Sequence, residues 1–530
     1  MIWTLARKEL LVNLLSLRFA LGTLVTVGLA ALVTYGLLGE YVVRRQVYLA
    51  EASRYQEELA QTKVYSMVAL TVGIPPSPLS IVSRGLRDLP TSVRVSPFDI
   101  PSLLHARPTQ TVITLERPWS FSGETERPPQ GNPLLRLFAA LDLVSLVSTV
   151  LSLLALLLVF DAFSGEREQG TLSMLMANPV GRRQLVAGKF LGALATLAVP
   201  LTLAALVVLV LLAASGEVEL DGAARLSLLL LYVASLLFLA AFAALGLLVS
   251  LRSRDSASAL IGALLVWVVM VAVIPEGGAY LAQLARPRLA QARFEEESAT
   301  AWKAFVEAYN AQTQNTWAPR FASSGSITGE CQVLGTTVES MQRLTEANQR
   351  VVPAQIRYAE EQHRRVEEYE AELRRWQRWQ EVLTLPSLPR VYARLSEALA
   401  ATDLAGYDHV VRQARGYRTA LVEYLQPYLS TPEWFTRMRE YPELAFTPQS
   451  EALAARAWAG DAAASEQWRR IFSWDRVQPL DLAGMPRPQL APHSPGARLG
   501  QAAGGLAVLA GFTVVLLGLA AWRTPPGWVG

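Results

Sequence analysis

The sequence SGEREQGTLSMLMANPVGRRQLVAGK, from Ser164 to Lys189, lies between two long apolar runs and predicts a short loop between two membrane helices. Its first half is charged, and its middle predicts a short helix. The apolar residues of that helix are Leu172, Met174, Leu175 and Met176. Asn178-Pro179 ends the helix, because proline disfavours a helical conformation of the residue before it. A loop with acids, bases and an apolar face is suited to docking on another protein.

The rest of the chain has the composition of a membrane protein. Of its 530 residues, 52% are hydrophobic, and the mean hydropathy is +0.26. The apolar residues are concentrated in blocks of about 20 residues, which is the length that crosses a bilayer. We expect an all-α polytopic protein with six transmembrane helices. The predicted spans are 19–39, 137–163, 190–214, 226–251, 256–274 and 501–522, with the loop 164–189 after the second span.

Three further segments lie outside these spans. Residues 1–18 alternate leucines with Arg7, Lys8 and Glu9, and predict an amphipathic helix at the membrane interface; an ordinary start of the first span is the alternative. Residues 40–136 begin as a helix up to about Leu70 and continue with prolines, which predict short strands and turns. Residues 279–495 form a large polar segment, which we expect to be mainly helical.

Orientation follows from the short loops. Arg7, Lys8 and Arg18 precede the first span, and further basic residues lie in the loop 164–189 and at Arg252, Arg254 and Arg523. In a six-span chain all of these positions fall on one side. The turn Glu217–Asp221 on the other side is acidic. The positive-inside rule therefore predicts that both termini are cytoplasmic and that 40–136 and 279–495 are external. Asp142 and Asp161 lie at the ends of the second span, where we interpret them as residues solvated near the interface, with Asp161 next to the charges of the loop.

The loop carries a resemblance to a known family. Glu166-Arg167-Glu168-Gln169-Gly170-Thr171-Leu172, followed by Pro179 and Arg182-Arg183, resembles the cytoplasmic loop of ABC-2 type permeases, the membrane subunits of one class of ATP-binding-cassette transporter. Arg7-Lys8-Glu9-Leu10 is similar to the interfacial helix with which these permeases begin, and the long external segment 279–495 resembles that of one subgroup.

The resemblance implies a function and a set of residues. The permease is expected to act mainly as an exporter in a bacterial-type inner membrane, driven by a separate ATPase subunit that holds the ATP and Mg²⁺. It implies pairing with a second permease half, either another copy or a similar chain. The ATPase-coupling residues it implies are Glu166, Arg167, Glu168, Gly170, Thr171, Leu172, Leu175, Met176 and Pro179. The three charged residues would pair with the ATPase, so we expect Glu166→Arg with Glu168→Arg to fold normally and to weaken its binding.

Other functions have less support in the sequence. It contains no GxxxxGK[ST], HExxH or GxSxG motif, so we expect no catalytic residue and no cofactor bound directly to this chain. The four histidines and the single cysteine, Cys331, show no metal-ligand spacing, and a net charge of +3 does not indicate nucleic-acid binding. The alternative function is a membrane-anchored envelope interaction or sensor protein whose external domain 279–495 binds a partner.

Overall fold

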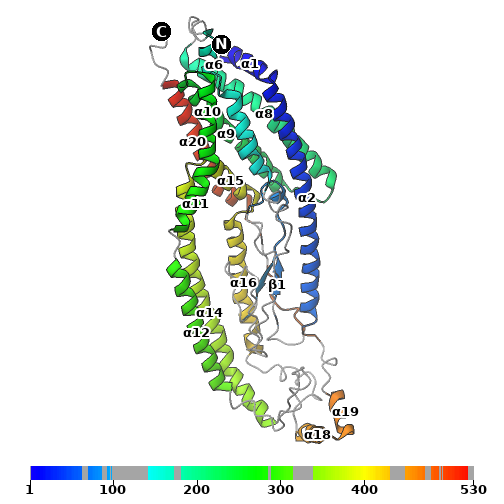
Figure 1. Ribbon diagram of the computed structural model, residues 1–530. Coiled ribbons are helices and arrows are strands. Elements are labelled where there is room, and N and C mark those ends of the chain that lie inside the picture. The colour runs from blue at the N-terminus through cyan, green and yellow to red at the C-terminus, as the bar shows by residue number, and fades with distance from the viewer. Residues whose placement is uncertain are drawn as a thin grey trace.

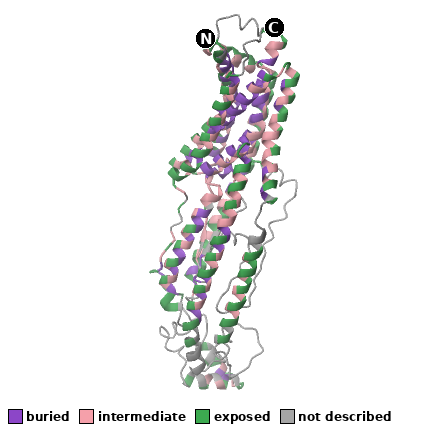
Figure 2. Ribbon diagram, turned by 90° about the vertical axis from the view of Figure 1, so that its left-hand side faces the viewer, coloured by how far each residue is buried: buried purple, intermediate pink, exposed green. Residues whose placement is uncertain are grey.

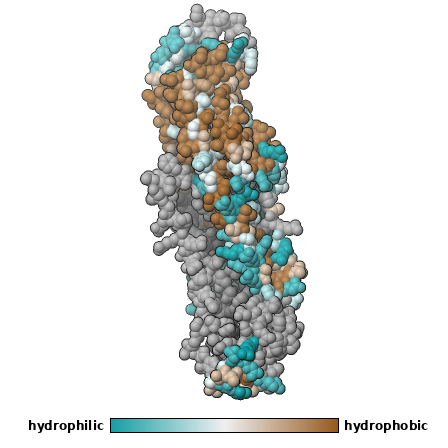
Figure 3. Space-filling model, turned by 90° about the vertical axis from the view of Figure 1, so that its right-hand side faces the viewer, coloured by the Kyte–Doolittle hydropathy of each residue, from teal (hydrophilic) through white to brown (hydrophobic). Residues whose placement is uncertain are grey.

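Among the residues that it describes, the computed structural model contains six helices that are long and apolar enough to cross a membrane. It describes residues 2–62, 68, 70–85, 92–95, 97, 141–171, 181–284, 288–313, 338–429, 448–471, 479–488, 491 and 493–522. The molecule is elongated, with both ends of the chain near one end of the helical bundle (Figure 1). On the face that Figure 3 shows, hydrophobic residues form a band over that part, and hydrophilic residues lie on either side of the band. The predicted class, an all-α polytopic membrane protein, is confirmed.

The spans begin and end at polar or capping residues. The first is α2 (Leu17–Ala60), which starts at the N-cap Ser16 and is preceded by α1 (Ile2–Leu14). The second begins at the N-cap Asp142, whose carboxylate accepts from the backbone N–H of Ser145 at 2.7 Å. It runs through α4 (Leu143–Leu146), the π-helical η4 (Val147–Leu151), α5 (Ser152–Val159) and, after a turn, α6 (Ser164–Glu168).

The other four spans follow in chain order. They are α8 (Arg182–Ser215), α9 (Gly222–Arg252), the fifth span with α10 (Ser256–Val268), η5 (Val269–Val273) and α11 (Ile274–Leu284), and the sixth, α20 (Pro495–Trp522). Buried residues are concentrated where these helices pack together (Figure 2). One apolar core joins α5, α8, α9 and α20, and Leu151, Leu197 and Phe238 are among its fully buried side chains.

Two helices continue beyond the predicted ends of their spans. The first span passes without a break into the expected helical start of the segment 40–136, so that α2 runs to Ala60, and its apolar stretch is followed directly by the alternating charges of a solvated surface. The fifth span does not end at Pro275: helix continues to Leu284. Proline is tolerated here because it directly follows the π-helical η5, where the local hydrogen-bond pattern is already shifted. Ser387 donates its hydroxyl to the carbonyl of Met270 in that preceding turn at 2.7 Å.

Beyond the spans, a second core unites the two outer segments. Four long helices extend from the membrane part: α12 (Arg288–Thr313), α14 (Val338–Thr384), α16 (Leu404–Leu429) and the end of α2. The strands β1 (Leu70–Gly73) and β2 (Ser92–Val95) pair antiparallel beside α16 (Figure 1). Leu59 and Val95 from the first segment pack with Leu421, Leu425 and Leu480 from the second. The segments 40–136 and 279–495 therefore share one core. The short helices α18 (Pro448–Trp458) and α19 (Ala462–Ile471) lie at the far end of the molecule (Figure 1).

One helix of the large segment packs among the spans. α15 (Leu388–Ala400) contacts α9, α20 and η5. The ring of Tyr392 stacks on Phe238 with centroids 4.7 Å apart, and its hydroxyl lies 2.7 Å from the hydroxyl of Ser235. Residues 279–495 are thus mainly helical in the part that the structure describes, as predicted, but they are not wholly separate from the spans. On the other side of α15, the short helix η2 (Pro78–Ile81) is tied to its end through Ser77, whose hydroxyl donates to the carbonyl of Ala400 at 2.7 Å.

Candidate coupling site

The charged half of the loop 164–189 forms the short helix α6 at the end of the second span. The backbone N–H groups of Phe163 and Ser164 donate to the hydroxyl of Ser250 on α9, at 2.9 and 3.1 Å. Phe163 and Ser164 are buried, at 2% and 0% exposure. This hydroxyl satisfies two N–H groups at the start of α6 that would otherwise lack a partner. α6 therefore starts from a fixed point on α9, close to α1 (Figure 1).

Glu166 faces the protein interior. Its Oε1 atom lies 2.8 Å from the Nζ atom of Lys189 on α8, and the same ammonium group lies 2.8 Å from Oε1 of Glu9 on α1. Lys8 is 3.8 Å from Glu166. The Lys189 side chain is only 2% exposed, so its charge depends on these two carboxylates. This Glu9–Lys189–Glu166 cluster joins three segments that lie far apart in the sequence.

Arg167 and Glu168 hold α6 to the turn between the fourth and fifth spans. The guanidinium of Arg167 donates to the carbonyls of Ser253 and Leu251, the latter at 3.3 Å, at the C-terminal end of α9. A cation is stabilising there, because the last carbonyls of a helix lack backbone partners. Glu168 accepts from the backbone N–H of Ser256 at 3.2 Å, at the N-terminus of α10, where an anion is stabilising.

Gly170 and Thr171 follow α6 and are the last described residues of this part of the loop. Gly170 has φ of +70°, a left-handed conformation that glycine adopts without strain and that often follows a helix. The hydroxyl of Thr171 donates to the carbonyl of Glu166 at 3.2 Å. The other predicted coupling residues, Leu172, Leu175, Met176 and Pro179, lie outside the described residues.

These contacts change one expectation about the charged residues. All three charged residues make contacts within the chain, and of the three only Glu168 is also exposed. Glu166→Arg would place a third cation beside Lys189 and Lys8 and would remove one carboxylate from a buried ammonium group. We therefore no longer expect the Glu166→Arg and Glu168→Arg double variant to fold normally.

Sequence reasoning missed three residues of this site. Glu9 was assigned only to the amphipathic N-terminal helix, and Lys189 only to the basic end of the loop. Two glycines bring these helices together: a Cβ atom on Gly188 would lie 2.8 Å from Cβ of Leu5, and one on Gly192 would lie 2.6 Å from Cβ of Glu9. The spacing Gly188-x-x-x-Gly192 was a signal for such a close helix crossing. Ser250 gave no signal, because serine is common in apolar helices.

The two acidic residues of the second span have structural partners. Asp142 is buried; besides capping α4, it accepts from the backbone N–H of Arg84 at 3.0 Å. Asp161 pairs with Arg18 at 2.8 Å, and the Arg18 guanidinium lies 4.9 Å from the centre of the Phe160 ring. This second ion pair ties the start of α2 to the end of the second span. Among the described residues, no group of three or more His, Cys, Asp or Glu side chains is placed to hold a metal ion.

Comparison with known proteins identifies relatives of this chain. Residues 3–340, which include the whole site, match the family described as ABC-2 family transporter protein. The probable ABC transporter permease protein NosY of Pseudomonas aeruginosa is 40% identical over 132 residues, which are 24% of this chain and 46% of that protein. The protein of the same name from Stutzerimonas stutzeri is 49% identical over 51 residues, 10% of this chain and 18% of its own length. Each match spans less than half of the relative.

Proposed function

Because the chain belongs to the ABC-2 family of transporter proteins, we propose that it is the membrane subunit of an ATP-binding-cassette transporter and that a separate ATPase drives it through the loop 164–189. The observation that carries this proposal is the position of α6. Glu166 pairs with Lys189 on α8, which also pairs with Glu9 on α1. Arg167 contacts the end of α9, and Glu168 contacts the start of α10. A force applied to α6 would therefore reach five membrane-associated helices at once, its own span included.

The loop then has two parts with different roles. The charged residues fix α6 to the permease, and the apolar residues Leu172, Leu175 and Met176 enter a groove of the ATPase. Pro179 ends the docking helix before α8 begins. When ATP binding closes the ATPase dimer, the docked loop moves, and α6 passes the displacement to the second and third spans. ATP and Mg²⁺ are held by the ATPase, and the permease itself catalyses no reaction.

Three further features of the proposal follow from the family resemblance. The transporter works as an exporter in a bacterial inner membrane. Its path lies between two permease halves, which are two copies or two similar chains. The exposed faces of the fifth and sixth spans support such pairing or contact with lipid. In the most apolar 18-residue stretch of each, only 11% and 17% of the residues are buried, against 72% in the second span.

An association assay tests the docking role. Leu172→Glu with Met176→Glu places two carboxylates in the proposed apolar contact, and burying an unpaired charge costs several kcal/mol. We expect the variant to lose at least tenfold in affinity for the ATPase subunit, measured by co-purification and by binding to the permease in nanodiscs. Its own unfolding temperature should stay unchanged, because neither side chain belongs to the Glu9–Lys189–Glu166 cluster.

Glu219→Arg is the control for this assay. Glu219 is 92% exposed at the opposite end of the spans and lies only 3.9 Å from Arg45 as a weak ion pair. This substitution should leave both ATPase association and ATP turnover intact. Wild-type affinity in the Leu172→Glu and Met176→Glu variant would show that the loop is not the coupling element.

The proposed orientation can be tested by labelling single cysteines. With Cys331 replaced by serine, cysteines at the exposed positions Glu219 and Gly460 should react with a membrane-impermeant maleimide added to intact cells. A cysteine at the exposed position Arg252 should react only after the membrane is opened. Labelling of Arg252→Cys in intact cells, with protection of Gly460→Cys, would reverse the orientation.

A further inference from the structure

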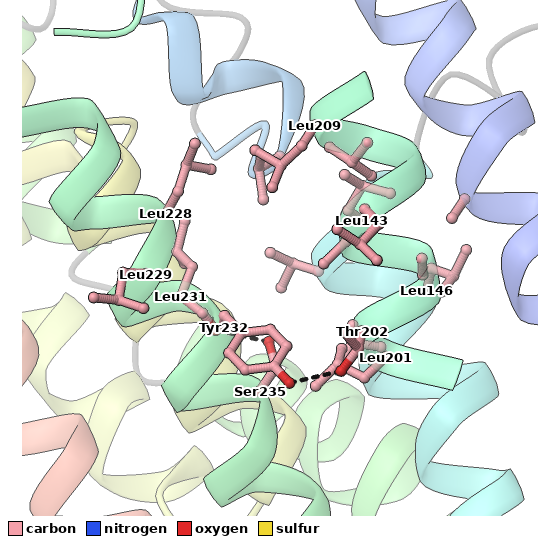
Figure 4. A pocket seen from close by; sticks show the side chains of 18 of the residues that line it. Leu143, Leu146, Leu201, Thr202, Leu209, Leu228, Leu229, Leu231, Tyr232 and Ser235 are labelled. Carbon is pink, nitrogen blue, oxygen red and sulfur yellow. Dashed lines mark hydrogen bonds between the residues drawn. The ribbon is translucent and has the colours of Figure 1, made fainter. Parts of the chain in front are cut away.

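A cavity of about 500 Å³ lies within the chain, between the second, third and fourth spans. Figure 4 shows leucine side chains from α4, α8 and α9 around the space. Its inner wall is mostly apolar and includes Val147, Leu151 and Leu231, which are at most 7% exposed. This volume falls in the range of roughly 300–1,000 Å³ that is typical of small-molecule sites.

The polar groups in the wall are already paired. The hydroxyls of Thr202 and Tyr232 lie 2.8 Å apart, as the dashed line in Figure 4 marks. The hydroxyls of Ser235 and Tyr392 lie 2.7 Å apart, and Ser235 also donates to the carbonyl of Leu231. A ligand inside the cavity therefore meets almost only hydrocarbon. Such a cavity does not hold water and instead binds apolar molecules.

The cavity opens sideways between α8 and α9. Three leucines that line it are also exposed on the outer surface of the bundle: Leu206 by 52%, Leu209 by 44% and Leu229 by 60%. They belong to helices long and apolar enough to cross a membrane, so the opening faces the bilayer. The molecules present at that opening are lipid acyl chains.

A cationic side chain lies at the rim of the cavity. Arg225 lines the cavity in the first turn of α9 and is exposed. Within the described ranges, its guanidinium makes one hydrogen bond, from Nε to the carbonyl of Asp221 at 3.4 Å, and no carboxylate lies within ion-pair distance of it. The neighbouring acids have other roles: Glu217 pairs with Arg45 at 3.1 Å, and Asp221 caps α9 through the N–H of Ala224 at 2.7 Å. The planar guanidinium is suited to a phosphate group.

The depth of the cavity also matches one leaflet. From Arg225 to Ser235, α9 rises by about 15 Å, at about 1.5 Å per residue. Half of the hydrocarbon core of a bilayer is also about 15 Å. We propose that this cavity binds one acyl chain of a membrane phospholipid, whose phosphate pairs with Arg225, in the leaflet at the end of the spans opposite α6. This site lies inside one subunit and depends neither on the ATPase nor on the transported substrate.

Photolabelling of the full-length protein in nanodiscs tests this proposal. The probe is a phospholipid with a diazirine near the end of one acyl chain, diluted in phosphatidylethanolamine and phosphatidylglycerol. Peptide mapping should find adducts concentrated on the cavity segments of α4, α8 and α9. It should find several-fold fewer on the exposed face of α10 that carries Ile261 and Leu265. Equal labelling of both surfaces would mean that only bulk lipid surrounds the protein, and would overturn the proposal.

Two pairs of measurements test the details. Ala205→Trp fills the cavity and should lower the labelling several-fold, whereas Val210→Trp on the bilayer-facing side of the same helix, where Val210 is 64% exposed, should not. Arg225→Gln should lower labelling by the phospholipid probe several-fold and leave labelling by an uncharged diazirine fatty alcohol unchanged. Undiminished labelling of the Ala205→Trp variant would overturn the cavity as the site, and an Arg225→Gln variant that labels normally would overturn the phosphate contact.

Discussion

Replacing Lys189 with methionine is expected to lower the free energy of unfolding by about 3–5 kcal/mol, the cost of removing one partner from a buried ion pair. Lys189 is almost completely buried, and its ammonium group lies 2.8 Å from both Glu9 and Glu166. Methionine keeps a similar length but leaves two carboxylates close together with only Lys8 nearby. Thermal unfolding of the full chain in detergent should show a clear fall in the unfolding temperature, and α1 should become sensitive to protease.

Two variants separate the loss of the ion pairs from other effects of the substitution. Arg183→Met removes a cation from an exposed position of the same helix and should change the unfolding temperature little. Adding Glu9→Gln and Glu166→Gln to Lys189→Met should recover most of the lost stability, because no buried carboxylate then lacks a cation. If Lys189→Met unfolds at the wild-type temperature, the cluster does not hold α6 to α1 and α8.

The order of segments could be predicted from the sequence, because it depends on composition alone. About 20 apolar residues in a row predict a span wherever they occur, and the six spans and the helical start of the segment 40–136 are found as expected. The ends of the helices could not be predicted as well. Pro275 indicated a stop, yet the helix continues after the π-helical η5, and the carbonyl of Met270 accepts a hydrogen bond from Ser387, more than one hundred residues later in the chain.

Tertiary contacts explain why α15 was not recognised. With 13 residues it is too short to span a bilayer, and its arginines resemble those of the solvated helices around it. Val391, Tyr392 and Leu395 nevertheless face α9 and α20 in the apolar core. Which helix of a long polar segment returns to the spans depends on the packing of the whole segment, and a local pattern does not contain that information.

The candidate site, too, could be predicted from the sequence only in part. The loop could be recognised from its charges, its Gly-Thr pair and its proline. The partner of each charged residue could not be predicted. Glu166 pairs with Lys189 and Lys8, Arg167 with the carbonyls near Ser253, and Glu168 with the backbone N–H of Ser256. Two of these partners are backbone groups, and backbone groups have no signature in a sequence. The inward contacts leave the apolar residues after Thr171 as the main candidates for docking.

Gly192→Leu is expected to separate α1 from α8. A Cβ atom at this position would lie 2.8 Å from the carbonyl oxygen of Ala6 and 2.6 Å from Cβ of Glu9. The atom of Ala6 belongs to the backbone, so no side-chain rotation can relieve the clash, and α1 itself has to move. Overpacking of this kind costs about 1–3 kcal/mol or more, and the movement also draws Glu9 away from Lys189.

Hydrogen exchange measured by mass spectrometry can locate this effect. In the Gly192→Leu variant, the backbone amides of α1 should exchange at least tenfold faster than in the wild type, while those at the centre of α9 should be unchanged. Gly28→Leu is the matched control, because a Cβ atom on Gly28 meets no atom within 4 Å. If α1 of the Gly192→Leu variant keeps its wild-type protection, the contact between α1 and α8 tolerates a large side chain. α1 would then not be held by the close helix crossing at Gly188 and Gly192, and the Glu9–Lys189–Glu166 cluster alone would have to position it.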